Sequence, residues 1–186
     1  MTDSASGLSS VEMTQLLALL AKVQQPYTRD LAEALCGCMP VLAIEAIIMR
    51  GEGRKTEVLL LDRPDDDLHW RGQVCVPGSL LRTSDKMIEQ VLERLARGEV
   101  LTPFASDKVI GYRLVTNSKG KRPSTFQLIH RVELASEPKS GKWYPVVALP
   151  QNLVATQADM IYAAAGITPN KNEDVREVVL PVTLLA

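Results

Sequence analysis

Apolar residues recur at helical spacing in two segments at the start of the chain. Residues 9–23 carry a leucine-rich stripe behind two serines, and Pro26 stops the pattern. A second segment, 28–37, begins with a threonine that can cap a helix and ends with a glycine that can stop one. We therefore predict an N-terminal helical hairpin, domain 1–38, in front of a main domain at 39–186. The apolar stripe needs a partner, either the flank of its own chain or a second subunit in a homodimer.

The rest of the chain alternates strand-like and helical patterns. Runs rich in β-branched residues, or apolar at every second position, are typical of strands. Such runs occur at 41–49, 57–61, 74–76, 109–116, 126–134 and 177–185. Helical spacing of apolar residues predicts a helix over 87–95, with Leu92 and Leu95 facing the sheet. This mixture of strands and helices places the main domain in the α/β class.

The segment 70–101 organises the main domain. Its strand ends at Pro77 and Gly78, a polar loop follows, and the predicted helix completes the segment. Proline fixes its own φ and glycine can take a positive φ, so we expect the chain to reverse sharply at this pair. Binding and catalytic residues often lie on loops between rigid elements, which makes this loop the first candidate for a functional site.

The same segment resembles the signature of the Nudix hydrolases, G-x5-E-x7-R-E-U-x-E-E-x-G-U, on a loop–helix–loop after a strand that usually ends in Pro-Gly-Gly. In an ungapped register, the first glutamate falls on Asp85 and the R-E-U-x-E-E core on 93–98, where no metal-binding glutamate is retained. One residue inserted between Asp85 and Arg94 places the arginine of the signature on Arg94 and its last core glutamate on Glu99. This register resembles the GDP-mannose mannosyl hydrolases, a branch that also lacks one core glutamate.

The resemblance in fold extends over residues 40–165. Residues 143–150 resemble the closing element of Nudix domains, in which an aromatic-led strand ends in Leu-Pro. A helix over about 156–165 would then pack back on the sheet. We therefore expect a Nudix-type α/β/α sandwich with a mixed sheet, to which the N-terminal helical hairpin is added.

The resemblance implies a hydrolase of a nucleoside diphosphate linked to another moiety. Magnesium or manganese would neutralise the diphosphate, while a carboxylate holds the metal or activates water. On this interpretation Glu99 is the metal ligand, Arg94 orients it, and Asp85 is a further catalytic candidate. A single protein carboxylate can suffice for Mg²⁺ when phosphate and water fill the other positions.

A basic loop between the strands at 109–116 and 126–134 has two interpretations. Lys119, Lys121 and Arg122 form either a solvated hairpin tip or a set of contacts to the phosphates of a nucleotide-type ligand. Only the second interpretation gives these residues a function.

The helix also leaves a choice between catalysis and binding. Glu89 and Glu93 lie one turn apart and could face a shared ion, whereas Glu93 and Arg97 have the spacing of an ordinary surface pair. At 95–98 the core acids of the signature are replaced by Leu, Ala, Arg and Gly. This replacement favours the alternative, a catalytically inactive Nudix-fold module that binds a ligand or a protein.

Composition narrows the classes of partner. With 46% hydrophobic and 23% charged residues, the chain is typical of a soluble globular protein. A net charge of -1 gives no long-range field to attract nucleic acid or an anionic membrane, so we expect neither as a partner. The sequence lacks a secretory signal pattern and the ~18 apolar residues of a membrane span, so a cytoplasmic location is predicted.

Three other features have structural interpretations. Cys36, Cys38 and Cys75 lack the spacing of a zinc site or a disulfide framework, so we expect free, buried thiols. The aspartates at 65–67 lack the ligand pattern of a calcium loop and are interpreted as solvated loop charge. His130 shares the apolar face of its strand, which favours a buried core histidine over a catalytic base.

Overall fold

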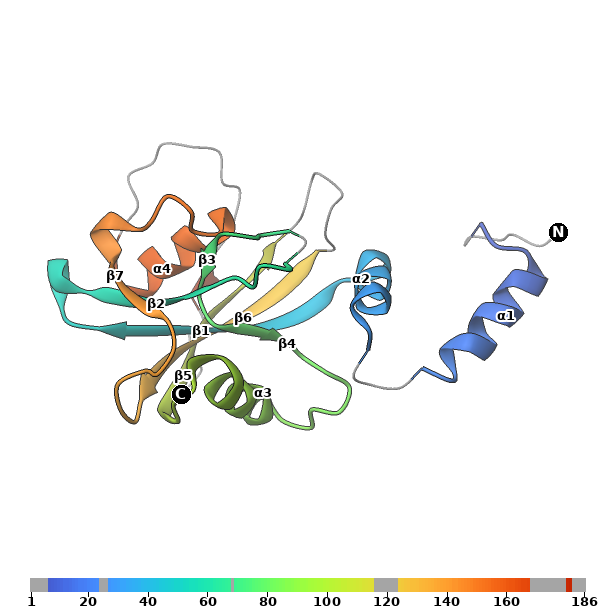
Figure 1. The fold of residues 1–186 in the computed structure, drawn as a ribbon, viewed down its shortest axis with the longest axis horizontal. Coiled ribbons are helices and arrows are strands. Elements are labelled where there is room, and N and C mark those ends of the chain that lie inside the picture. Colours follow the sequence, from blue (N-terminus) through green and yellow to red (C-terminus); the bar gives the residue numbers. More distant parts are fainter. Residues whose placement is uncertain (1–6, 24–26, 68, 116–123, 168–179, 182–186) are drawn as a thin grey trace. The chain divides into compact units, whose positions relative to one another are not determined.

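The chain forms two compact units, Met1–Leu35 and Cys36–Ala186. The structure is a computed structural model, and it describes residues 7–23, 27–67, 69–115, 124–167 and 180–181 (Figure 1). Among the helices of these residues, none combines the length and the apolar character that a membrane span requires.

The N-terminal unit contains the helix α1, Ser10–Leu20, and most of α2, Arg29–Cys38. The side chain of Ser9 accepts the N–H of Glu12, and the Glu12 carboxylate accepts the N–H of Ser9, so the two residues cap α1 reciprocally. α1 buries none of its residues, so which partner covers its apolar stripe remains a prediction. α2 continues past Gly37, the predicted end, because an interior glycine costs a helix only about 1 kcal/mol.

The larger unit is built on a mixed sheet. Its strands are β1 Val41–Arg50, β2 Glu57–Asp62, β3 Val74–Cys75, β4 Gly78–Leu80, β5 Phe104–Val115, β6 Thr125–Leu134, β7 Lys142–Pro145 and β8 Leu180–Pro181. The main path through the sheet runs β3-β2-β1-β6-β5-β8, with β4 paired to β1 and β7 paired to β2. β1 and β6 are parallel and the other paired strands are antiparallel, so the predicted mixed sheet is confirmed.

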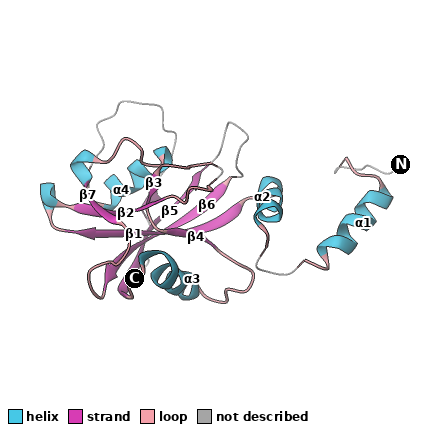
Figure 2. Ribbon diagram, in the orientation of Figure 1, coloured by secondary structure: helices cyan, strands magenta, loops and turns pink. Residues whose placement is uncertain are grey.

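Two helices cover opposite faces of this sheet (Figures 1 and 2). They are α3, Ile88–Leu95, and α4, Ala158–Ala164. Successive residues of β1 point to opposite faces, so Ile44 joins the core under α3 and Ile47 joins the core under α4. Leu92 and Leu95 are both buried in the α3 core, as predicted. The α/β/α sandwich expected from the sequence is therefore the fold of this unit.

The remaining elements are short turns of helix. They are the 3₁₀ turns η1 Gly53–Lys55, η3 Val146–Ala148 and η4 Ala155–Gln157, and the π-turn η2 Ala96–Val100. The predicted closing strand is therefore shorter than expected and ends at Pro145. β5 begins earlier than predicted, at Phe104, because its pairing with β6 extends to Leu134.

The C-terminal strand-like run at 177–185 has a partner over its described part. Leu180 and Pro181 pair with Tyr112 and Gly111 of β5. The rest of the run lies outside the described residues.

At Pro77 and Gly78 the chain passes from β3, which pairs with β2, to β4, which pairs with β1. β3 pairs with the end of β2, whereas β4 pairs with the first half of β1, where Gly78 lies opposite Glu45. Between them, the carbonyl of Pro77 accepts the N–H of Ala46 at 2.8 Å. The pair thus brings the chain onto the central strand beside the candidate site.

Candidate functional site

A small cavity of 190 Å³ lies where β1, β3, β4 and β6 meet residues 154–157. Its polar lining includes Glu45, Arg63, Ser79 and Gln127. Glu99, the predicted metal ligand, lies close enough to Arg63 for the two charges to interact. The predicted residue Glu99 therefore lies near two charged residues that the sequence did not single out, Glu45 and Arg63.

Glu45 is an acid at the centre of the sheet, only 6% exposed. Its Oε1 accepts a hydrogen bond of 2.7 Å from Nε2 of Gln127 on β6. Gln127 in turn accepts from Nε of Arg113 on β5, and the Arg113 guanidinium also donates to the carbonyl of Thr156. Because a buried carboxylate is costly without hydrogen bonds, this row across three strands holds the Glu45 carboxylate in place.

Gly78 is required by Glu45 rather than by its own backbone angle. Its φ is not positive, so the sharp reversal through a positive φ that the sequence suggested is wrong. A Cβ at this position would instead lie 2.4 Å from Oε2 of Glu45, well inside van der Waals contact. The glycine therefore leaves room for the buried carboxylate of the neighbouring strand.

Glu99 lies on η2, where α3 widens into a π-turn. In an α-helix, residues five apart point about 140° away from each other, but an i→i+5 turn brings them towards one face. Glu99 accordingly comes within electrostatic reach of Arg94, and it accepts the backbone N–H of Gly78. Burial raises the pKa of Glu99, while this hydrogen bond and the charges of Arg63 and Arg94 act in the opposite direction.

Asp85 and Arg94 form an ion pair that the sequence did not predict, since Arg94 was expected to orient Glu99. Arg94 Nη1 donates to Asp85 Oδ1 at 2.7 Å and Nη2 donates to Oδ2 at 3.0 Å. Nη2 also donates to the carbonyl of Leu80 at 3.1 Å. The side-chain hydrogen bonds from Arg94 lower the pKa of Asp85. The pair therefore ties the loop before α3 to the helix and to β4, and Arg94 acts on Glu99 through charge.

Arg63, directly after β2, is the centre of a second cluster. Its Nε donates to Asp67 Oδ2 at 2.9 Å, and its Nη2 also bonds to that oxygen. The guanidinium lies 5.5 Å from the centre of the Trp70 ring, and its Nη1 donates to Sγ of Cys75 at 3.8 Å. Burial raises the pKa of the Cys75 thiol to about 11.

The cluster corrects the interpretation of one aspartate. Asp67 was expected to be solvated loop charge, but its side chain is mostly buried and bonded to Arg63. Its Oδ1 accepts the N–H groups of His69 at 2.9 Å and Trp70 at 2.8 Å. These backbone hydrogen bonds and the contact with Arg63 lower the pKa of Asp67 to about 2, against the opposing effect of burial.

The burial predicted for His130 is confirmed, whereas the burial predicted for the thiols is confirmed for Cys75 and is wrong for Cys38. His130 is buried, and its Nδ1 lies 2.8 Å from Oδ2 of Asp107. Cys75 is a free, buried thiol, and Cys38 is exposed.

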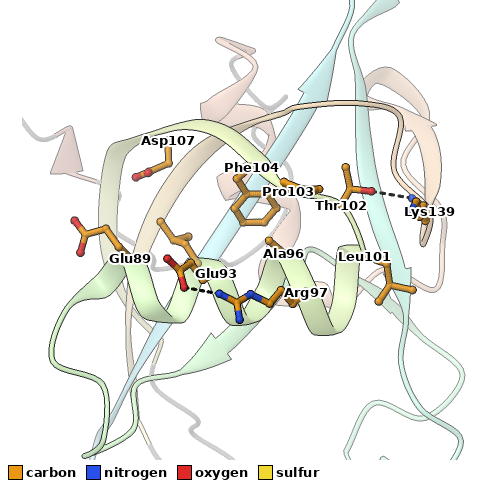
Figure 3. Close-up of a pocket in the computed structure, with 11 residues that line it drawn as sticks. Glu89, Glu93, Ala96, Arg97, Leu101, Thr102, Pro103, Phe104, Asp107 and Lys139 are labelled. Carbon is orange, nitrogen blue, oxygen red and sulfur yellow. Dashed lines mark hydrogen bonds and ion pairs between the residues drawn. The ribbon is translucent and has the colours of Figure 1, made fainter.

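A larger hollow of 680 Å³ lies between α3 and the start of β5 (Figure 3). Glu89 and Glu93 line it, but Glu93 pairs with Arg97 at 2.9 Å, as the surface interpretation predicted. Asp107, the third acid on its wall, is the partner of His130. These acids are thus engaged with neighbours or lie singly, and we place the candidate chemistry in the smaller cavity.

Glu45, which lines the smaller cavity, and Glu99, which lies near Arg63, are the candidate ligands for a divalent cation. Within the described residues, no three His, Cys, Asp or Glu side chains gather as a metal group. Two carboxylates do contact one residue, since Glu45 packs against Gly78 and Glu99 accepts its N–H. Mg²⁺ commonly uses one or two protein carboxylates and takes its other ligands from phosphates and water. Two carboxylates are thus within the number that Mg²⁺ or Mn²⁺ uses when a phosphate ligand supplies further oxygens.

Some predicted residues cannot be placed, and some important ones were not predicted. Lys119, Lys121 and Arg122 lie outside the described residues. Glu45 and Arg63 were not predicted as site residues. The sequence held a signal for Glu45, because it is the one acid in the apolar run VLAIEAIIM. Arg63 held none, since its partners come from a loop and from another strand.

No protein-family model and no curated protein sequence matches this chain. Among solved structures, a MutT Nudix hydrolase from Burkholderia pseudomallei has a TM-score of 0.56 and 15% identity over 66% of this chain and 96% of its own. The Nudix domain of NrtR from Shewanella oneidensis, in complex with ADP ribose, has a TM-score of 0.55 and 16% identity over 86% and 98%. A Nudix hydrolase from Nitrosomonas europaea has a TM-score of 0.50 and 15% identity over 70% and 93%. The fold of this chain is therefore that of the Nudix hydrolases.

Proposed function

We propose that this protein is a divalent-cation-dependent hydrolase of a nucleoside diphosphate linked to another moiety. The observation that carries the proposal is the meeting of Glu45 and Glu99 at Gly78, beside a cavity that also contains Arg63. Nucleotide sugars are the first substrates to test, because the gapped register of Asp85, Arg94 and Glu99 resembles the mannosyl-hydrolase branch.

Glu99 and Glu45 are the residues that would hold the cation. When bound, Mg²⁺ or Mn²⁺ would neutralise the diphosphate and polarise the phosphorus–oxygen bond under attack. The Gln127 amide fixes one of these carboxylates, and the Gly78 N–H orients the other. The ion pair of Asp85 with Arg94, and the bond from Arg94 to the carbonyl of Leu80, hold the loop before α3 against β4, whose residues line the cavity.

A second candidate is a module that binds a nucleotide without cleaving it. It is favoured by the small number of acids, since the described residues contain no group of three metal-binding side chains. The NrtR domain of the same fold was solved with ADP ribose, which is a ligand of that protein. In this alternative the cavity would hold a nucleotide-type ligand without chemistry.

A hydrolysis screen over nucleotide sugars, dinucleotides and nucleoside triphosphates, with Mg²⁺ or Mn²⁺, separates the two candidates. We expect turnover that falls by about 100-fold or more in Glu99→Gln, because charge stabilisation by the metal contributes several kcal/mol and each ~1.4 kcal/mol is tenfold in rate. Glu93→Gln is the matched control and should retain activity, since this exposed acid pairs with Arg97. Absence of turnover for every compound would support the binding module. Equal activity of Glu99→Gln and the parent would refute the assigned role of Glu99.

A further inference from the structure

We propose that Arg63 is the anion-binding group of the small cavity and that it holds a phosphate of the nucleotide ligand. The inference rests on the proposed function for the identity of the ligand, but its test does not require hydrolysis. Arg63 lines the cavity together with Glu45 and Gln127, and it interacts electrostatically with Glu99. A phosphate at Arg63 would thus lie in the same cavity as one of the two acids assigned to the cation.

Arg63 is held in one orientation before any ligand arrives. Asp67 accepts from its Nε and its Nη2, and the other oxygen of Asp67 accepts the N–H groups of His69 and Trp70. The loop therefore fixes Asp67, and Asp67 fixes the guanidinium. A pre-positioned side chain loses little conformational entropy when a ligand binds, which favours affinity.

The guanidinium keeps donors for a ligand. Its contacts use Nε, Nη1 and Nη2 once each, and each Nη atom carries a second N–H. Within the described residues, the acceptor opposite Nη1 is Sγ of Cys75, which is a weak acceptor and stays protonated because burial raises its pKa to about 11. The side chain is 27% exposed, so a ligand can reach it. Paired N–H groups on a planar cation match phosphate oxygens well.

The surroundings also suit the rest of a nucleotide. Trp70 lines the cavity and offers an aromatic ring beside the cation. The hydroxyl-bearing residues Ser79 and Thr125 line it as well. The competing explanation is that Arg63 only braces its own loop through Asp67, and the experiment must separate these roles.

Affinity for inorganic pyrophosphate and for ADP, each with Mg²⁺, should be measured by calorimetry on the full chain. We expect Arg63→Gln to weaken both by about tenfold to hundredfold, because charged hydrogen bonds are lost. Arg63→Lys, which keeps the charge but loses the fork, should show an intermediate loss. Arg131→Gln is the control, since this exposed arginine donates to the backbone carbonyl of Ala164 at 3.1 Å and does not line the cavity. It should bind like the parent.

A bracing role predicts a different pattern. Arg63→Gln and Arg63→Lys would then melt earlier but bind both probes with unchanged affinity while folded, which would overturn the inference. Failure of the parent to bind either probe would also overturn it. Loss of affinity in Arg63→Gln without hydrolysis by the parent would sustain the inference and refute the hydrolase. Hydrolysis by the parent together with an unchanged KM in Arg63→Gln would sustain the hydrolase and refute the inference about Arg63.

Discussion

The substitution Gly78→Ala tests the packing at the centre of the site. The added Cβ would lie 2.4 Å from Oε2 of Glu45 and 3.0 Å from its Cδ, so the carboxylate must move. The end of a flexible side chain usually moves at little cost. Glu45, however, is 6% exposed and accepts a hydrogen bond of 2.7 Å from Gln127, so moving its carboxylate breaks a buried, charge-assisted hydrogen bond.

The expected loss of stability follows from this bond. A hydrogen bond to a charged group contributes about 1.5–3 kcal/mol to the free energy of unfolding. Replacing glycine by alanine offsets roughly 0.4–1 kcal/mol of this loss, because the unfolded chain then has less conformational entropy. The net loss is therefore about 0.5–2.5 kcal/mol. At roughly 2–4 °C per kcal/mol for a protein of this size, Tm should fall by about 1–10 °C.

Thermal and urea unfolding of four variants measures this effect with its controls. Gly98→Ala is the matched glycine, because a Cβ there meets nothing within 4 Å, and it should be neutral or stabilising by up to about 1 kcal/mol. In a Glu45→Ala background the clash is removed, so adding Gly78→Ala should cost little. An equal loss from Gly78→Ala in both backgrounds, or no loss in the parent, would refute the contact with Glu45.

Two further predictions concern titrating groups. Cys75 should resist alkylation by iodoacetamide at pH 8 in the folded protein, because burial raises its pKa to about 11, whereas the exposed Cys38 should react. Peptide mass spectra measure both rates, and equal rates would contradict the burial of Cys75. Asp67 has its folded pKa lowered from 3.8 to about 2, so its stabilisation is fully present above pH 3.8 and is lost as the pH falls towards 2. Asp67→Asn should cost about 1 kcal/mol at pH 7, discounted for the partly exposed Arg63, and little at pH 2, which urea unfolding at both pH values can check.

The elements that the sequence predicts well are those set by local periodicity. Leu92 and Leu95 recur at helical spacing, and α3 buries both against the sheet. Asp85 and Arg94 were selected through the family resemblance, and they form an ion pair because the loop before the helix is short enough to return to it. Local pattern also identified the Glu93 and Arg97 pair on the exposed face.

The features that the sequence did not predict depend on long-range pairing. Gly78 was assigned to a turn, because its contact with Glu45 arises only when β4 pairs with β1. Arg63, just after the strand predicted at 57–61, was not singled out, because its partners are brought together by a loop and by β3. The π-turn that carries Glu99 is a wider turn that periodicity cannot distinguish from an α-helical end.

Packing explains why acids are missing from the middle of the helix. In the gapped register the first core glutamate falls on Leu95, which is fully buried in the core that also contains Ile44 and Val132. A carboxylate there would be buried without a partner, at a cost of several kcal/mol. The two acids assigned to the cation come instead from the end of the helix and from the sheet, as Glu99 and Glu45 do. A cation held by these two would depend on the pairing of β4 with β1, which sets the distance between the strand and the helix end. On this argument, substitutions that shift β4 should weaken cation binding even when both carboxylates are retained.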